Sequence, residues 1–342
     1  MKKRLVYFGH WTNPIGEEIL SKDANTEMAF YERGISLEEM KTALATAHGY
    51  LLSLREISVN AELLMDCPNL LAVGSRVAGF EAVDVDACTE AGVLVVNQGG
   101  IGNEPVAEHV IAAMISLSKN IPQADRALRA GHIKRPGEFT GNDVKGRIMG
   151  VIGMGNIGAR VADICKTAFQ MRVLVHDPFL SDEVILERGG EPCSLDDLMS
   201  DSDYVTLHVP LSEKTRGMIG KKEFAMMKPT AYFINTSRGP NIDETALTVA
   251  LQEGALAGAA LDVWDPEPPS PDNPLLKMDN VLATQHTSGP TFQAHEAMSY
   301  STAEQWAAIF RGEKPPRLAN PEAWPNYIER YTRVVGEPPQ EI

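Results

Sequence analysis

The chain has 342 residues, four cysteines and a formal net charge of −15 at pH 7. This length predicts about two domains, and the acidic charge argues against nucleic acid or an anionic membrane surface as a partner, because both would repel the protein. The scattered cysteines show no CxxC pair and no metal-type spacing, which predicts reduced thiols, a cytoplasmic protein and no metal site. No run reaches the ~18 continuous apolar residues that a membrane helix needs.

The N-terminal part of the chain alternates short apolar runs with helical patterns. A first strand is predicted at residues 5–8, and the loop at 9–14 that follows it either helps to shape a ligand pocket or is surface decoration. Ser36 and Glu39 form a capping-box pattern for a helix through Ala47. Further strands are predicted at residues 50–54, 70–74 and 93–97. Such alternation is typical of a parallel sheet with crossover helices, so this part predicts an α/β unit of its own.

A long apolar helix is predicted to begin near Asn103, which can cap it, with Pro105 in the first turn. We place a domain boundary at this point. Strand–helix alternation then resumes, and the later apolar runs, at residues 204–209, 231–235, 259–263 and 281–284, are typical of buried parallel strands. The segment from Glu329 is polar and contains proline, which predicts a loosely ordered tail.

The central motif is Gly153-Met154-Gly155-Asn156-Ile157-Gly158, which lies between an apolar run and a helical pattern. The first glycine permits a tight turn, the second lets the backbone approach a pyrophosphate, and the third allows close packing of helix on strand. Asp177 ends the next apolar run, where a carboxylate can accept both hydroxyls of an adenosine ribose; a plain turn aspartate is the alternative. Pro178 and Phe179 follow, with no arginine to hold a 2′-phosphate, so the pattern favours NAD over NADP.

Polar clusters follow the later strands, and the carboxyl ends of parallel strands meet at one edge of a sheet, so these clusters are expected to converge on one crevice. Within them, Arg238 offers a planar charged fork that can bind a carboxylate and polarise a carbonyl. His286 can give a proton to a carbonyl oxygen or take one from an alcohol, and Glu267 can orient that imidazole. Taken singly, each side chain has an ordinary structural explanation, but together they predict a hydride-transfer site.

These motifs, in this order, resemble the D-isomer-specific 2-hydroxyacid dehydrogenase family, whose members include phosphoglycerate and glycerate dehydrogenases. The likeness runs from about Leu70 to about Ser299. It implies an α/β protein in which a Rossmann dinucleotide-binding domain at residues 104–289 is inserted into a flavodoxin-like, discontinuous substrate domain at residues 1–103 and 290–342. It also implies NAD as cofactor, a small anionic substrate and a homodimer.

By the same resemblance, Arg238 would bind the substrate carboxylate and carbonyl, Glu267 would support the histidine, and His286 would be the acid/base. Substrate-binding residues would be Val77, Ala78 and Gly79 together with Arg238 and His286. Asp262 would hold the nicotinamide carboxamide. The full set expected along NAD is Gly153, Gly155, Asn156, Ile157, Gly158, Asp177, His208, Val209, Pro210, Thr215, Thr236, Ser237, Arg238, Asp262, His286, Ser288 and Gly289.

Some positions depart from the family pattern and leave the substrate open. Val77 stands where glycine is common, and Gln285 stands where proline usually precedes the histidine. Arg76 either adds positive charge at the mouth of the site or points into solvent. The leading prediction is an NAD-dependent enzyme that transfers a hydride to or from C2 of a small 2-oxo or D-2-hydroxy acid. Two alternatives are an NAD(H)-sensing binding protein of the corepressor type and a dehydrogenase of a phosphite-type oxyanion.

Overall fold

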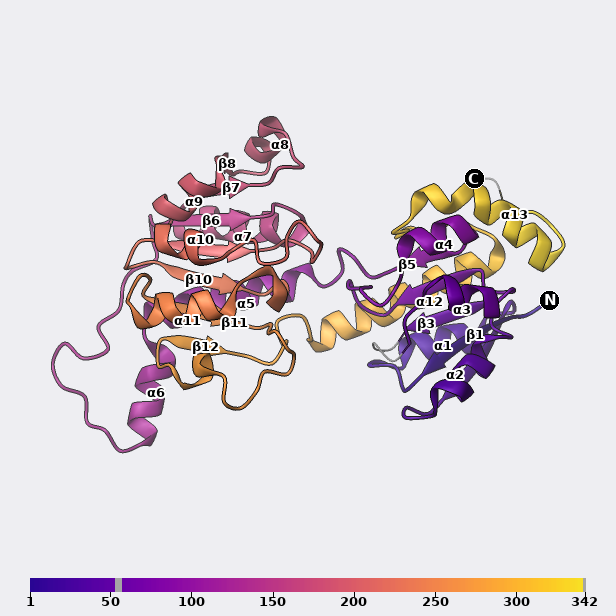
Figure 1. Ribbon diagram of the computed structural model, residues 1–342, viewed down its shortest axis with the longest axis horizontal. Coiled ribbons are helices and arrows are strands. Elements are labelled where there is room, and N and C mark those ends of the chain that lie inside the picture. Colours follow the sequence, from indigo (N-terminus) through magenta and orange to yellow (C-terminus); the bar gives the residue numbers. More distant parts are fainter. Residues whose placement is uncertain (53–56, 341–342) are drawn as a thin grey trace. The chain divides into compact units, whose positions relative to one another are not determined.

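The computed structural model of the chain describes residues 1–52 and 57–340 (Figure 1). The chain forms two compact units. One, here called the discontinuous unit, consists of Met1–Gly102 and Pro290–Ile342, and the other, the continuous unit, is Asn103–Gly289. Among the described residues, no helix combines the length and the apolar character needed to cross a membrane.

The discontinuous unit is built on a five-stranded parallel sheet with the order β2-β1-β3-β4-β5. This is the flavodoxin-like order, so the predicted fold of this part is confirmed. Its strands are β1 (Lys3–Phe8), β2 (Thr26–Tyr31), β3 (Gly49–Leu52), β4 (Ala72–Ser75) and β5 (Leu94–Val96). Its helices are α1 (Ile15–Lys22), α2 (Leu37–Leu44), α3 (Ala61–Asp66), α4 (Val85–Ala91), α12 (Phe292–Arg311) and α13 (Trp324–Val335).

Local patterns in this unit had different outcomes. The capping box of Ser36 and Glu39 is present, but its helix ends at Leu44 rather than Ala47. The edge strand β2 was not predicted, because its mixed burial gives no clear alternation. Of the strand expected at residues 50–54, the last two positions lie outside the described residues.

The prediction of a loosely ordered tail from Glu329 is wrong for the helical part of that segment. It belongs to α13, in which Arg330 and Tyr331 are buried. The Arg330 guanidinium donates hydrogen bonds to four backbone carbonyls of the N-terminal half of the unit, those of Leu70 (2.5 Å), Cys67 (3.0 Å), Ala91 (3.0 Å) and Pro68 (3.3 Å). The amphipathic helix therefore closes one side of the first sheet.

Helix α12 covers the same sheet with Trp306, which is fully buried. A Cβ atom at Gly49 of β3 would lie 2.3 Å from the indole ring, and one at Gly74 of β4 would lie 2.9 Å from it. Glycine at both positions thus lets the tryptophan lie against the backbone of the central strands. Segments from both ends of the chain build this core together.

The continuous unit contains seven parallel strands in the order β12-β11-β10-β9-β6-β7-β8. The order reverses between β6 and β9, which is the switch point where dinucleotides bind in Rossmann sheets. Its strands are β6 (Ile148–Ile152), β7 (Arg172–His176), β8 (Glu191–Pro192), β9 (Tyr204–Leu207), β10 (Tyr232–Asn235), β11 (Gly258–Leu261) and β12 (Val281–Ala283). Its α-helices are α5 (Asn103–Ser118), α6 (Ile121–Arg129), α7 (Asn156–Phe169), α8 (Asp182–Glu187), α9 (Leu195–Asp201), α10 (Lys221–Met226) and α11 (Glu244–Gln252).

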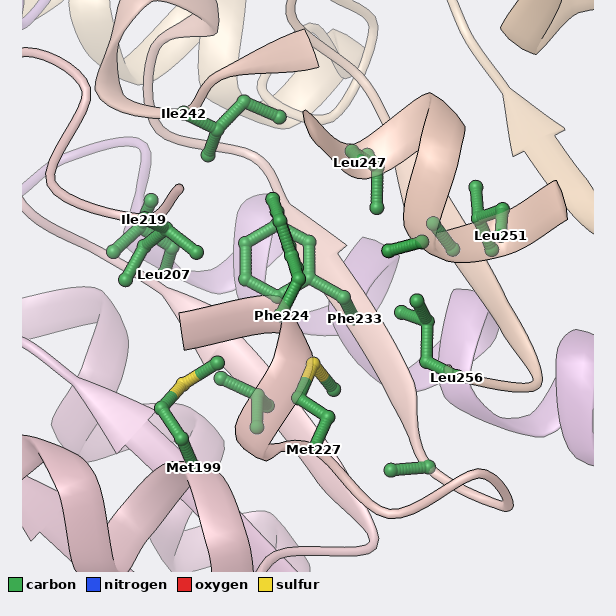
Figure 2. Close-up of a cluster of buried hydrophobic side chains, with 14 of the residues drawn as sticks. Met199, Leu207, Ile219, Phe224, Met227, Phe233, Ile242, Leu247, Leu251 and Leu256 are labelled. Atoms are coloured by element: carbon green, nitrogen blue, oxygen red, sulfur yellow. The ribbon is translucent and has the colours of Figure 1, made fainter. Parts of the chain in front are cut away.

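A buried cluster of large apolar side chains fixes one face of this second sheet (Figure 2). The rings of Phe224 and Phe233 meet edge to face, with centroids 5.3 Å apart, a geometry favoured by their quadrupoles. Leu207 ends β9 in the same cluster, and Phe233 lies in β10. Packing at this face therefore anchors β9 and β10 close to their carboxyl ends, after which the polar loops begin.

Helix α6 is different from the other helices of the continuous unit because none of its residues is buried. It extends from the sheet of its own unit and is followed by a long loop (Figure 1). Exposed fractions are 50% for Ile121, 75% for Leu128 and 88% for Ile133 of the following loop. We call this segment, residues 121–140, the arm.

Candidate active site

The glycine-rich turn joins β6 to α7, and two of its three glycines have no room for a side chain. Gly153 has φ +87°, and a Cβ there would lie 2.8 Å from the carbonyl oxygen of His208. Gly158 is tighter, since a Cβ would lie 2.2 Å from the Gly153 oxygen. At Gly155 a Cβ would meet nothing within 4 Å. The turn therefore has open space beside Gly155, where Asn156 and Ile157 begin α7 and its amide groups can face an anion.

Asp177 follows β7 and is half-buried at this turn. Its Oδ2 accepts the Met154 N–H at 2.9 Å, and its Oδ1 accepts the Phe179 N–H at 3.0 Å. Each carboxylate oxygen has further acceptor capacity. The carboxylate is thus fixed beside the glycine turn, where it can take ribose hydroxyls.

The loop after β9 carries His208, Val209 and Pro210. Val209 lies against the turn, because a Cβ at Gly153 would be 2.9 Å from its Cγ1. Burial lowers the pKa of His208 to about 4, and its Nε2 lies 3.0 Å from the Thr206 hydroxyl. Thr215 closes the loop, since its hydroxyl donates to the Pro210 carbonyl at 2.7 Å.

The loop after β10 is organised by Asn235, whose Oδ1 accepts both the N–H (3.0 Å) and the hydroxyl (2.8 Å) of Ser237. The Asn235 amide in turn donates to the Arg238 carbonyl at 3.0 Å. Arg238 is half-buried, and its Nη1 donates to the Ser237 carbonyl at 2.7 Å. The buried Thr236 hydroxyl has no hydrogen-bond partner among the described residues, which suits a loop that receives a polar ligand.

Asp262, after β11, is only 1% exposed and is engaged by the loop that follows β12. Its Oδ1 accepts the Thr284 hydroxyl at 2.6 Å and the Thr287 N–H at 2.8 Å, while Oδ2 accepts the Ser288 N–H at 2.9 Å. Burial alone would raise the pKa of Asp262, but these hydrogen bonds lower it overall. The loop is therefore wrapped around one ionised carboxylate.

His286 lies within this wrapped loop. Its backbone N–H donates to the Asp262 carbonyl at 2.7 Å, and its φ of +54° is unusual for a residue other than glycine. The Nδ1 atom lies 2.6 Å from Oε1 of Glu267. This contact fixes the imidazole ring and leaves Nε2 on the opposite side, available for proton transfer.

One polar residue beside this loop was missed by the sequence reasoning. His109, on α5, has its Nε2 3.4 Å from the Thr284 hydroxyl, which itself donates to Asp262. The only available signal was a polar residue within a long apolar helix. Among the described residues, no group of His, Cys, Asp and Glu side chains is arranged to hold a metal ion.

The loop expected to bind substrate belongs to the discontinuous unit and follows β4. Its carbonyls are turned toward the protein: that of Val77 accepts from the Gln98 N–H (3.0 Å), that of Ala78 from the Asn97 amide (2.8 Å) and that of Gly79 from the Ser75 hydroxyl (2.6 Å). Arg76, at the start of this loop, makes a contact of its own. Its guanidinium donates to the carbonyls of Phe8 and His10, so it ties this loop to the loop after β1.

Comparison with known proteins agrees with this architecture. Residues 111–288 match the NAD binding domain of the D-isomer specific 2-hydroxyacid dehydrogenases. A D-3-phosphoglycerate dehydrogenase of Archaeoglobus fulgidus is 37% identical over 87% of this chain, which spans only 56% of that protein. A glyoxylate reductase of Aeropyrum pernix is 34% identical over 94% of this chain and 97% of its own length. The crystal structure of a D-lactate dehydrogenase from Aquifex aeolicus, complexed with NAD and lactic acid, superposes with a TM-score of 0.81 at 27% identity, over 92% of this chain and 98% of that one.

The protein therefore belongs to the class of two-unit α/β proteins with a Rossmann nucleotide-binding sheet. More specifically, it is a member of the D-isomer specific 2-hydroxyacid dehydrogenase family, whose members are NAD-dependent oxidoreductases. The continuous unit fits that cofactor on its own geometry, through the open space at Gly155, the fixed Asp177 carboxylate and the orphaned Thr236 hydroxyl.

Proposed function

We propose that this chain catalyses NAD-dependent hydride transfer at C2 of a small 2-oxo or D-2-hydroxy acid, with His286 as acid/base. The observation that carries the proposal is the 2.6 Å contact between His286 Nδ1 and Glu267 Oε1, on a loop folded around Asp262. A histidine oriented in this way exposes a single nitrogen for proton transfer. The contact is made at the strand edge that also carries the glycine turn.

When bound, NADH supplies the hydride that converts the carbonyl carbon of a 2-oxo acid to an alcohol. In that direction the Nε2–H of His286 gives its proton to the carbonyl oxygen, and in the reverse direction Nε2 takes the alcohol proton. Glu267 stabilises the protonated ring through Nδ1–H and keeps its orientation. Thr236, Asp262 and the first turn of α7 are the groups proposed to hold the cofactor.

Arg238 is proposed to bind the substrate carboxylate and to polarise the adjacent carbonyl. Its Nη1 is held by the Ser237 carbonyl, which orients the plane of the guanidinium. Arginine carries five N–H donors in a fixed fork, so one such contact still permits bidentate binding of a carboxylate.

In the discontinuous unit, the loop at Val77, Ala78 and Gly79 is proposed to bind an anionic group of the substrate through backbone N–H groups. The inward hydrogen bonds of its three carbonyls support this, because they fix the backbone. Within the described part of the chain, the N–H groups of Ala78 and Gly79 have no hydrogen-bond acceptor. Backbone amides held in this way bind carboxylates well.

A substrate panel tests the proposal. Oxidation of NADH would be followed by absorbance with glyoxylate, hydroxypyruvate, pyruvate, phosphohydroxypyruvate and an aromatic 2-oxo acid, and phosphite would be tested with NAD. Saturable turnover of one 2-oxo acid, lost in His286→Ala, is the expected result. Tight NADH binding with no turnover of any 2-oxo acid would contradict the proposal and favour an NAD(H)-sensing binding protein. Turnover of phosphite alone would favour a dehydrogenase of a phosphite-type oxyanion.

We also propose that the protein is a homodimer and that the arm contributes to the interface. The support is the exposure of Ile121, Leu128 and Ile133 on one projecting segment, because isolated proteins rarely expose several large apolar groups together. Light scattering should give twice the chain mass for the wild type. Leu128→Glu with Ile133→Glu should shift it toward the monomer, whereas Val249→Glu, at another exposed apolar position, should not.

A further inference from the structure

Arg188 lies directly after α8 and reaches the glycine-rich turn. Its Nη1 donates to the carbonyl of Met154 at 2.5 Å, although thirty-four positions separate the two residues. Met154 stands between the first two glycines of the motif. No arginine stands next to Asp177 in the sequence, but the fold brings Arg188 to this turn from further along the chain.

Asp177 and Arg188 form hydrogen bonds with the two backbone groups of the same residue, Met154. The carboxylate accepts the Met154 N–H, and the guanidinium donates to the Met154 carbonyl. Both residues lie in the described part of the chain, and no ion pair is formed between them there. An acidic and a basic side chain thus flank the place where the adenosine ribose is proposed to bind.

Arg188 differs from two nearby arginines in that no carboxylate pairs with its charge among the described residues. Arg160 on α7 is paired with Glu104 and Asp163, and Arg172 on β7 is paired with Glu191. Arg188 has no carboxylate within ion-pair distance among the described residues, and its side chain is exposed. Its positive charge is therefore available to an incoming anion.

We propose that Arg188 is a cofactor-selectivity residue, a ligand for the 2′-phosphate of NADP whose use is prevented by the Asp177 carboxylate. A 2′-phosphate carries about two negative charges near neutral pH, so Asp177 repels it, while the ribose of NAD offers hydroxyl donors that the same carboxylate accepts. Removing the carboxylate leaves a guanidinium fork that matches phosphate geometry. The inference rests on the proposed cofactor edge but not on the acid/base assignment.

The test is direct binding of NADPH and NADH, followed by the fluorescence of the nicotinamide, with the ratio of the two dissociation constants as readout. Wild type should prefer NADH. Asp177→Ser should shift the ratio toward NADPH by ~10–100-fold, and adding Arg188→Gln should reverse most of that shift. Asp177→Ser with Arg188→Lys should keep only part of it, because an ammonium lacks the fork. Asp177→Asn repeats the series with an isosteric side chain in case the serine variant folds poorly.

Lys166→Gln is the matched control in the Asp177→Ser background. The Lys166 ammonium donates to the nearby Gly189 carbonyl at 3.3 Å, so it is an exposed cation of the same region without a contact to the glycine turn. If Lys166→Gln lowers NADPH preference as much as Arg188→Gln, or if Arg188→Gln has no effect, the assignment of Arg188 is wrong. Failure of the wild type to bind NADH at all would instead overturn the proposed function.

Discussion

Asp177 and Asp262 each follow a buried strand of the same parallel sheet, at the ends of β7 and β11. Asp177 is half-buried and accepts two backbone N–H groups, one from Phe179 two residues later and one from Met154 in the glycine-rich turn. Asp262 is almost fully buried and accepts groups from a loop more than twenty residues later. The contrast shows that two strand-end carboxylates can differ in what their donors build: Asp177 is fixed beside the glycine-rich turn, whereas Asp262, also proposed to hold the cofactor, builds the loop that carries His286.

The largest expected effect is on kcat, when the histidine that this loop carries is removed. His286→Ala should lower kcat by ~10²–10⁴ while the dissociation constant of NADH stays nearly unchanged. Steady-state kinetics and fluorescence titration measure the two quantities. His132, which forms another histidine–glutamate pair with Glu138 on the arm, provides the control: His132→Ala should leave kcat within about twofold. Full activity of His286→Ala would show that His286 is not the acid/base.

Arg238→Lys should raise KM for the 2-oxo acid by ~10–100-fold, because an ammonium cannot replace the two parallel hydrogen bonds of a guanidinium. NADH binding measures whether the β10 loop is still folded. If the substrate affinity were unchanged, Arg238 would not be the residue that binds the carboxylate. The roles proposed for Asp262 and His286 would still stand.

Asp262→Asn should lower the free energy of unfolding by ~1–3 kcal/mol, because an amide cannot accept from Thr284, Thr287 and Ser288 as the carboxylate does. The folded pKa of Asp262 is lowered, so the stability it contributes is fully present above its unfolded pKa of about 4 and is lost as the pH falls through the folded value. Urea unfolding at several pH values should therefore show the difference between wild type and variant shrinking only in acid. A constant difference down to low pH would contradict this.

For Asp177→Asn we expect the larger effect on cofactor binding and the smaller one on stability. It should weaken NADH binding by about tenfold, since charged hydrogen bonds to the ribose become neutral. The free energy of unfolding should fall by about 1 kcal/mol, less than for Asp262→Asn, because Asp177 accepts only two N–H groups and is half-buried. If Asp177→Asn destabilised the fold as much as Asp262→Asn, the distinction between the two carboxylates would be lost.

The smallest effect at neutral pH is expected at His208. Its folded pKa lies near 4, below the ordinary value of 6.5, so the unfolded chain takes up this proton first as the pH falls. Stability is then unaffected above about pH 6.5 and declines between pH 6.5 and 4. In His208→Gln the melting temperature should therefore fall less with decreasing pH over that interval than it does in the wild type. Thermal melts at several pH values measure this.

Local chemistry made much of the continuous unit predictable. The β6–turn–α7 element follows from three glycines, two of which have no room for a side chain, and the convergence of the polar loops follows from parallel topology. The contacts that could not be foreseen are those between distant segments. Arg188 reaches Met154 only after α8 has folded back, and the donors to Asp262 come from beyond β12. In both cases the sequence shows the charged residue but not its partner.

The misjudged C-terminal segment has the same origin. Read alone, residues after Glu329 are polar and contain proline, so they lack the signs of a buried helix. Arg330 is buried because backbone carbonyls of the N-terminal half satisfy its guanidinium. A charged residue can thus be part of a core when its partners are backbone groups, which carry no sequence signature.

These carbonyl contacts, together with Trp306, bear on the order in which the two units can finish folding. The five strands of the first sheet leave the ribosome early, but the tryptophan that covers β3 and β4 and the arginine that satisfies Leu70 and Ala91 are synthesised only after the whole Rossmann sheet. Domains usually fold in the order of their synthesis. Here the unit that begins first is completed last, so one face of its sheet stays uncovered while the Rossmann sheet is being synthesised.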